Sequence, residues 1–214
     1  MASRPLILIG GGEHARVVAE AVRSGPLGPS LLGFVDPDAS ERTSKLELPR
    51  LGDDSALAHH PGAVAVLGIG ASGPSSHRAE VVGRLSPLVS SWAVVIHQTA
   101  WVSPSASLGE GTVVMAGAVV NSGARIGNHC VVNTGVVIEH DVVLGDYVFV
   151  GPGATIGGGA TIGAGAFVGL GCCVRDHRAV GVRALVGMGA VVVNDVPAGA
   201  TVMGVPARAT VQGA

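Results

Sequence analysis

The sequence has few aromatic residues and few charged ones. Phe, Trp and Tyr together make up 3% of the 214 residues, and Asp, Glu, Lys and Arg make up 13%. Hydrophobic residues nevertheless account for 48% of the chain, and there are 34 glycines. A core of Val, Ile, Leu and Ala with so few rings predicts a narrow, regularly repeated interior.

An excess of one charge sign is also missing. The formal net charge is −2, which provides no basic field for nucleic acid or an anionic membrane surface. The first apolar run, PLILI, is followed at once by glycine and charge. It is too short for a secretory signal or a membrane span. We therefore expect a cytoplasmic protein that binds neither nucleic acid nor a membrane.

Cysteine is scarce as well. Cys130, Cys172 and Cys173 have neither the number of a disulfide framework nor the spacing of a zinc site. This pattern is typical of a reducing compartment, and no metal site is expected.

What the sequence does contain is a repeat. From Ile96 to Val192 an aliphatic residue recurs at every sixth position, seventeen times in a row. A small residue or valine usually stands two positions before it, and glycine often follows it. This pattern predicts a parallel β-helix, in which three hexads make one triangular coil, so that seventeen give about six coils and residues 18 apart stack. The aliphatic residues would face inward, and Cys130 and Cys172 would fill the core.

The first 95 residues follow a different pattern. Strands alternate with helices, which predicts a small Rossmann-like parallel α/β domain over 1–95, followed by the β-helix over 96–214. The polar stretch 37–54 is expected to be a loop. The expected strands are PLILIGGG, LLGFVDPD, AVAVLGIG and WAVVIH, and the expected helices are EHARVVAEAVRSG and HRAEVVGRLSP.

A glycine-rich turn follows the first expected strand. It fits G-x-G-x-x-A between a strand and a helix, where backbone N–H groups can approach a phosphate. An acid ends the second strand, where it could bind a ribose or a base. We expect a nucleotide-linked substrate here rather than a dinucleotide, because only about 95 residues precede the repeat; a tight turn without a ligand is the remaining alternative. The residues expected to bind the substrate are Gly10, Gly12, Glu13, His14, Asp36 and Gly70.

The segment Glu139-His140-Asp141 interrupts an aliphatic run. In its hexad these residues occupy the corner positions, where side chains project outward, so they cost no core burial. A histidine with a carboxylate partner can serve as a general base near neutral pH. The alternative is a solvated corner without a role, and His129 is the next histidine to consider.

Several motifs together resemble a known family. The GGGEHA turn, the FVDPD strand end, the hexads, NTGVVIEHD and the closing GVPAR resemble the hexapeptide-repeat acetyltransferases of the sialic acid O-acetyltransferase and UDP-amino-sugar N-acetyltransferase (NeuD/PglD-like) family. The resemblance covers essentially the whole chain. It implies a left-handed β-helix, a homotrimer, and acetyl-CoA bound between neighbouring helices.

The resemblance also implies roles for particular residues. His140 would be the general base, and Asp141 the acid that raises its basicity. Gly158, 18 residues after His140, would contact acetyl-CoA and donate its N–H to the oxyanion of the attacked thioester. Leu170 and Met188 would also contact acetyl-CoA.

Two departures stand out. Phe149, in FVGPGA, stands where relatives often have a histidine near the thioester. The loss of that histidine removes a polar contact, but Phe149 would still line the pantetheine. Arg178 occupies a normally small, inward position. The expectation for that region is either a group of cations for the CoA phosphates or a local bulge with solvated arginines. The cations in question are Arg175, His177, Arg178, Arg183 and Arg208.

The sequence thus predicts acetyl-CoA-dependent N-acetylation of a nucleotide-linked amino sugar, with a UDP-4-amino-4,6-dideoxyhexose as the favoured substrate. The amine would attack the thioester directly, without an acyl-enzyme. O-acetylation of sialic acid or another sugar hydroxyl is one alternative. A non-catalytic β-helix scaffold, supported by Phe149, is the other.

Overall fold

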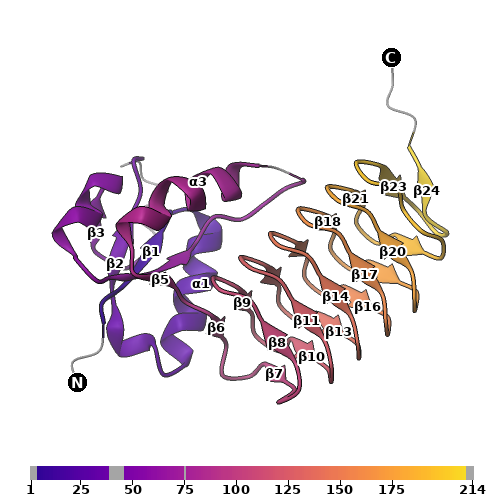
Figure 1. Ribbon diagram of the computed structural model, residues 1–214, viewed down its shortest axis with the longest axis horizontal. Coiled ribbons are helices and arrows are strands. Elements are labelled where there is room, and N and C mark those ends of the chain that lie inside the picture. The colour runs from indigo at the N-terminus through magenta and orange to yellow at the C-terminus, as the bar shows by residue number, and fades with distance from the viewer. Residues whose placement is uncertain (1–3, 39–45, 75, 211–214) are drawn as a thin grey trace. The chain divides into compact units, whose positions relative to one another are not determined.

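The computed structural model describes residues 4–38, 46–74 and 76–210. By their contacts the residues divide into two compact units (Figure 1). The first comprises Met1–Gly70 and Ser76–Gln98, and the second comprises Ala71–Ser75 and Thr99–Ala214. This division falls three residues after the boundary predicted at residue 95.

The first unit contains a parallel sheet with the strand order β3-β2-β1-β4-β5. The chain order reverses at β1, which lies between β2 and β4. In sheets of this kind, ligands bind outside the carboxyl ends of the strands at such a switch point. The strands are β1 (Leu6–Ile9), β2 (Leu31–Val35), β3 (Arg50–Gly52), β4 (Val64–Leu67) and β5 (Ser91–Trp92).

Two α-helices belong to this unit, α1 (Glu13–Ser24) and α3 (His77–Leu85). Helix α1 buries Ala15, Val18 and Val22, which recur at the spacing of one helical face. It ends where the N–H of Gly25 donates to the carbonyl of Val22. The 3₁₀ segments are η1 (Gly28–Ser30), η2 (Asp54–His59) and η3 (Ser86–Leu88).

Two details of the predicted α/β unit are wrong. The stretch 37–54 is not only loop, because it includes strand β3, whose pairing with β2 shifts register beside Phe34. Its side chains are at least partly exposed, so no apolar run marked it. WAVVIH forms two strands, β5 and β6 (Val95–Ile96), and Ile96 is 39% exposed instead of facing inward. Within the predicted loop, residues 39–45 lie outside the described residues.

The second unit is a parallel β-helix with three sheets of mostly two-residue strands (Figure 1). One sheet has the order β22 (Val191–Val192), β19 (Cys173–Val174), β16 (Thr155–Ile156), β13 (Val137–Ile138), β10 (Val119–Val120), β7 (Trp101–Val102). Another has the order β20 (Ala179–Val180), β17 (Thr161–Ile162), β14 (Val143–Leu144), β11 (Arg125–Ile126), β8 (Ser107–Leu108). The third includes β24 (Arg208–Ala209), β23 (Thr201–Met203), β21 (Leu185–Val186), β18 (Phe167–Val168), β15 (Phe149–Val150), β12 (Val131–Val132), β9 (Val113–Val114).

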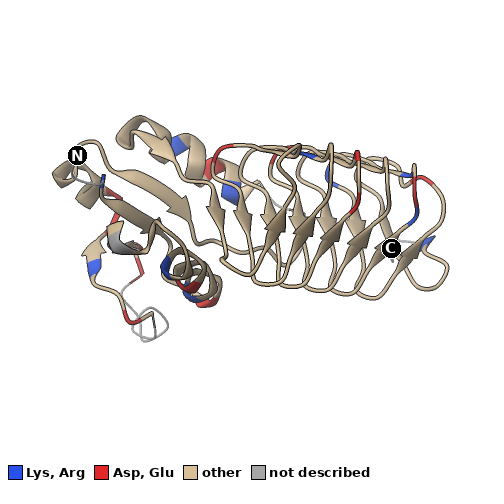
Figure 2. Cartoon of the chain, turned by 90° about the horizontal axis from the view of Figure 1, so that it is seen from below, with Lys and Arg blue, Asp and Glu red and all other residues tan. Residues whose placement is uncertain are grey.

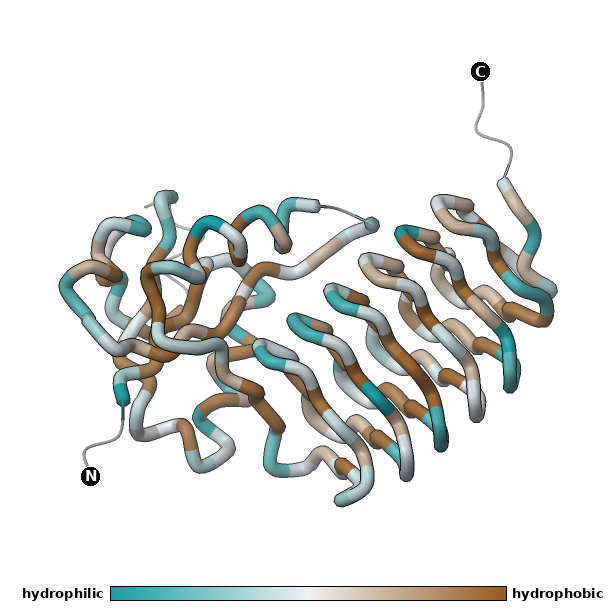
Figure 3. Tube along the Cα trace, viewed as in Figure 1, coloured by the Kyte–Doolittle hydropathy of each residue, from teal (hydrophilic) through white to brown (hydrophobic). Residues whose placement is uncertain are grey.

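The predicted stacking and core are confirmed. Val137 pairs with Val119 on one side and with Thr155 on the other, which is a register of 18 residues. From Val114 to Val192, every sixth-position aliphatic residue is buried in one continuous core. Cys130 and Cys172 are buried in the same core. In Figure 3 the brown segments accordingly recur from coil to coil.

The corners between strands repeat a left-handed backbone conformation. A positive φ recurs at every sixth residue from Gly111 to Gly189, mostly at glycine. Asp141 adopts it with φ 59°, which a residue with a Cβ does at some cost. We call residues 121–124, 139–142, 157–160 and 175–178 the His140 corner.

A second corner differs in composition. We call residues 115–118, 133–136, 151–154, 169–172 and 187–190 the Met188 corner. This corner contains no Asp, Glu, Lys or Arg. Figure 2 shows one long edge of the coils without red or blue.

None of the helices in the described part of the chain is long and apolar enough to cross a membrane. Nor do the described ranges bring together three His, Cys, Asp or Glu side chains that could hold a metal ion.

Candidate active site

His140 stands at the end of β13 with its side chain 57% exposed. Its Nδ1 lies 2.9 Å from Oδ2 of Asp141, the next residue. A carboxylate only accepts, so this contact assigns the ring proton to Nδ1 and leaves the lone pair of Nε2 available. The structure therefore brings together the two side chains predicted to act as base and partner, with the basic nitrogen free.

The surroundings make this imidazole more basic. The hydrogen bond to Asp141 is the main cause that raises the pKa of His140 above its ordinary value. Partial desolvation opposes this increase, and the charges of Asp141, Glu139 and Asp176 raise the pKa of His140 further. Three carboxylates thus act on one histidine, in a corner that also contains Arg175 and Arg178.

The role of Asp141 can be tested without any substrate. Asp141→Asn should lower the pKa of His140, because it removes the charge that stabilises the imidazolium. The measurement is an NMR titration of the His140 ring, whose pKa in wild type should lie above the ordinary value of a histidine. Asp146→Asn, at another corner, is the matched control and should leave the titration unchanged. Equal pKa values in wild type and Asp141→Asn would contradict this account.

The next coil provides space for the imidazole. Gly157, Gly158 and Gly159 follow β16 at the same corner. A Cβ at Gly158 would lie 2.6 Å from Nε2 of His140, closer than real Cβ atoms come. A Cβ at Gly157 would collide with the carboxylate of Asp176, from the coil after. The glycines therefore leave room for side chains reaching this segment from both neighbouring coils.

The N–H of Gly158 already has a partner. It donates to Oδ1 of Asp176 at 3.0 Å. An acetyl oxygen could accept from the same N–H, as the resemblance implies, only if Asp176 shared or released it. Asp176 was not predicted from the sequence, although its place, two coils after His140, follows from the 18-residue register.

His129, the reserve base, is not available for such a role. It is 5% exposed, and its ring stacks on Tyr147 with the centroids 5.2 Å apart. The pair occupies a corner other than that of His140. His129 is therefore a packed residue of the β-helix.

The residues predicted to contact acetyl-CoA lie elsewhere on the coil. Leu170 and Met188 are 46% and 75% exposed on adjacent coils of the Met188 corner. Phe149 is only 7% exposed, and its ring stacks on Phe167 at a centroid distance of 5.2 Å. Phe149 thus offers little surface to a pantetheine chain. One face of the triangular coil separates the Met188 corner from His140.

The expected bulge at Arg178 is absent. The strand that follows pairs Thr161 with Ala179 and Ile162 with Val180 without a shift. The guanidinium of Arg178 instead turns to Asp195, at 3.6 Å. The predicted cations do not gather at one place, since Arg175, His177 and Arg178 belong to the His140 corner, while Arg183 and Arg208 lie on other parts of the coil.

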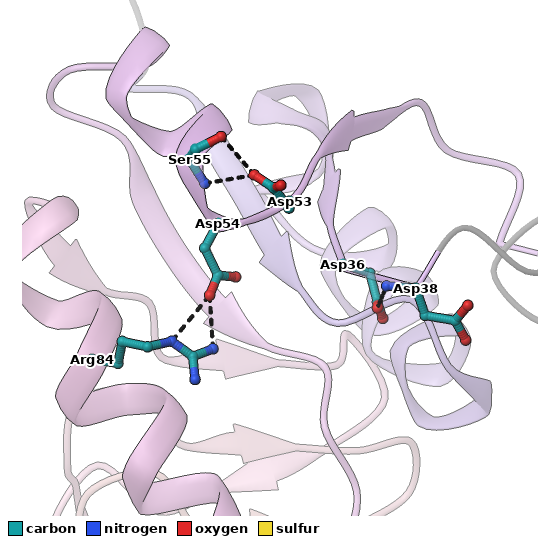
Figure 4. A network of polar contacts seen from close by, with 6 residues as sticks. All are labelled: Asp36, Asp38, Asp53, Asp54, Ser55 and Arg84. Atoms are coloured by element: carbon teal, nitrogen blue, oxygen red, sulfur yellow. Dashed lines mark hydrogen bonds and ion pairs between the residues drawn. The ribbon is translucent and has the colours of Figure 1, made fainter.

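In the first unit, the residues expected to bind the nucleotide cluster at the carboxyl ends of the strands. Gly10 has φ 94°, and a Cβ there would lie 2.9 Å from Cγ1 of Ile69. Asp36 accepts from the N–H of Gly11 at 2.6 Å. It also accepts from the N–H of Asp38 at 2.8 Å (Figure 4). Each carboxylate oxygen keeps a further lone pair for a ligand.

His14 and Gly70 also meet at this edge, since a Cβ at Gly70 would lie 3.1 Å from Cβ of His14. Burial, together with the charge of Arg78, lowers the pKa of His14 to about 4. His14 is therefore neutral at pH 7. Arg78, which is 4% exposed, was not predicted. Gly12 and Glu13 face open space and solvent at the start of α1.

A polar network fixes the segment beyond β3. Asp53 caps η2 through the N–H of Ser55 at 2.9 Å, and Asp54 forms an ion pair with Arg84 at 2.7 Å (Figure 4). These contacts are exposed, so they position the segment more than they stabilise it.

Both units match models of known protein families. Residues 5–85 match the PglD N-terminal domain, and residues 105–140 and 141–176 match the bacterial transferase hexapeptide (six repeats). A search of curated protein sequences gives no match.

Solved structures match over almost the whole length. PerB from Caulobacter crescentus, in complex with CoA and GDP-perosamine, is 36% identical with a TM-score of 0.87, covering 97% of each chain. A histidine-to-asparagine mutant of perosamine N-acetyltransferase from the same organism is 34% identical, with the same score and coverage. The acetyltransferase domain of PglB from Neisseria gonorrhoeae, with acetyl coenzyme A, is 33% identical with a TM-score of 0.88, covering 98% of this chain and 100% of that one.

These likenesses confirm the predicted fold class. The chain has a Rossmann-like α/β unit followed by a left-handed parallel β-helix of hexapeptide repeats.

Proposed function

The chain belongs to the NeuD/PglD-like family of hexapeptide-repeat acetyltransferases, and on that premise we propose that it transfers the acetyl group of acetyl-CoA to the amine of a nucleotide-linked amino sugar. The observation that carries this proposal is the His140–Asp141 pair, with Nε2 free at an exposed corner. The solved relatives named with CoA and GDP-perosamine support the choice of substrates.

In the proposed reaction the amine attacks the thioester carbonyl, forming a C–N bond and breaking the C–S bond. His140 takes the proton that the amine loses and returns it to the sulfur of CoA. Asp141 orients the ring and stabilises the imidazolium that forms. Gly158 would offer its N–H to the oxyanion once Asp176 shares or releases it.

The first unit would bind the nucleotide. Its glycine turn, the start of α1 and the carboxylate of Asp36 lie together at the switch point of the sheet. The UDP-linked sugar remains a prediction, and the GDP-linked sugar of the relative is the other substrate to test.

Activity is tested with purified protein, acetyl-CoA and a thiol reagent that detects released CoA. We expect CoA release and an acetylated product with GDP-perosamine or with a UDP-4-amino-4,6-dideoxyhexose. Turnover of sialic acid but of neither amino sugar would favour O-acetylation. If no amino sugar and no hydroxyl acceptor led to CoA release, a non-catalytic scaffold would be favoured instead.

A homotrimer would complete the site. The predicted base and the predicted acetyl-CoA contacts lie at different corners of one chain, so a neighbouring subunit could place its Met188 corner beside His140. We expect a trimer by light scattering at micromolar concentration. We also expect that mixing subunits of His140→Ala with subunits of Met188→Asp restores part of the activity that each variant lacks. A monodisperse monomer, or mixtures without activity, would contradict the intersubunit site.

A further inference from the structure

The glycine segment 157–159 receives side chains from two coils. His140 reaches it from the coil before, and Asp176 reaches it from the coil after. Their contacts fall on consecutive residues, because His140 lies against Gly158 and Asp176 lies over Gly157. The basic nitrogen and this carboxylate therefore face the same short stretch of backbone.

The carboxylate of Asp176 is only partly engaged. Oδ1 accepts from the N–H of Gly158 at 3.0 Å, and Oδ2 has no hydrogen-bond partner in the described part of the chain. Within the described ranges Asp176 also forms no ion pair. Arg178, two residues on, turns to Asp195. Arg175 and His177 are exposed beside Asp176.

The same contact occurs at another corner, where the neighbouring histidine is packed, since His129 is 5% exposed and stacks on Tyr147. Asp146, at a different corner, accepts from the N–H of Asn128 at 2.7 Å and lies over Gly127, as Asp176 lies over Gly157. In both places an aspartate carboxylate accepts a hydrogen bond from a backbone N–H of the preceding coil. What sets Asp176 apart is that His140 reaches the same glycines and that its charge raises the pKa of His140.

We propose that Asp176 is a specificity-determining residue, whose carboxylate holds the amino group of the acceptor sugar beside Nε2 of His140. This inference rests on the proposed function and deepens it. An amino sugar in water is largely an ammonium ion, which forms charge-assisted hydrogen bonds to a carboxylate. It loses one proton to solvent before the amine attacks, and His140 takes the second as the C–N bond forms. Oδ2 can accept one of these hydrogen bonds now, and Oδ1 becomes available if the acetyl oxygen takes the N–H of Gly158.

The charge of the corner supports an amine over other acceptors. With Glu139 and Asp141, Asp176 gives three carboxylates near His140. They attract a cationic acceptor and repel one that has its own carboxylate, as sialic acid does. A neutral hydroxyl can donate one hydrogen bond to a carboxylate, but it carries no positive charge for the carboxylates to attract. Asp176 therefore favours N-acetylation over O-acetylation at this site.

The test compares wild type, Asp176→Asn and Asp146→Asn. Asparagine keeps an oxygen that can accept from the N–H of Gly158 at position 176 and from the N–H of Asn128 at position 146, so both variants should fold, which their Tm values check. The ligands are the nucleotide-linked amino sugar that wild type acetylates, GDP-perosamine or the UDP-linked sugar, and its analogue with a hydroxyl in place of the amine. Binding is measured by calorimetry in the presence of CoA, alongside the KM for acetyl-CoA.

Asp176→Asn should raise the Kd of the amino sugar by about tenfold or more, the scale of a hydrogen bond to a charged group. It should raise the Kd of the hydroxyl analogue much less, because the amide oxygen of asparagine can still accept from a hydroxyl. The KM for acetyl-CoA should stay within about twofold, the scale of an exposed contact. Asp146→Asn should change none of these values. An equal loss for both ligands, or no difference between the two variants, would overturn the role of Asp176. Wild type that acetylates no amino sugar would instead refute the proposed function.

Discussion

Replacing His140 by alanine should lower kcat by about 10²–10⁴-fold, the usual effect of removing a general base. The KM for acetyl-CoA should change little, because the imidazole takes a proton in the transition state and adds little to ground-state binding. Steady-state kinetics with acetyl-CoA and the amino sugar provide both values. His140 is exposed and lies outside the core, so the variant should remain folded.

Variants of the two residues beside His140 should lower kcat by smaller amounts. Asp141→Asn should cost less than the loss of His140, because the base remains while its orientation and basicity weaken. Glu139→Gln should cost least, since Glu139 contacts the backbone N–H of His140 at 3.3 Å and not its ring. Near-wild-type turnover in a folded His140→Ala protein would show that the triplet is a solvated corner.

Gly158→Ala should lower kcat by about 10²-fold, the scale expected when a catalytic group is displaced by about 1 Å. The new Cβ would stand 2.6 Å from Nε2 of His140, so the imidazole must move away. The backbone itself accepts alanine, because Ala116 and Ala164 occupy the equivalent position in other hexads. The comparison is kcat and Tm against wild type, and Tm should be nearly unchanged.

A double variant separates this steric effect from a general loss of structure. In His140→Ala the imidazole is gone, so adding Gly158→Ala should cost little more. Additive losses of kcat would mean that the Cβ acts through something other than His140, such as the N–H of Gly158. A large drop in Tm would assign the effect to folding.

The β-helix could be predicted almost to the residue, because its core depends on a strict period. Val114 and every sixth residue to Val192 face inward, and nothing outside the hexads is needed to place them. Strand β3 was not predicted, because its exposed residues form no apolar run. Ile96 fits the period but lies on the strand β6, before the closed coils, where no full core surrounds it.

The candidate site was only partly predictable. His140 and Asp141 are adjacent in sequence, so their contact follows from local geometry. Asp176 and Gly158 meet through a rotamer and a backbone N–H that the period allows but does not require. The burial of Phe149 depends on the ring of Phe167, and the low pKa of His14 depends on its surroundings and on Arg78.

The register of 18 residues means that the proposed site at the His140 corner depends on the number of hexads between its residues. Adding one hexad between Asp141 and Gly157 would leave every inward residue inward, and the core would remain intact. It would nevertheless turn everything that follows onto the next corner, so that Gly158 and Asp176 no longer stood beside His140. Adding three hexads would restore the corner but insert a whole coil between His140 and Gly158. The β-helix can therefore lengthen by whole coils at either end of this segment, while the spacing from His140 to Asp176 has to be kept.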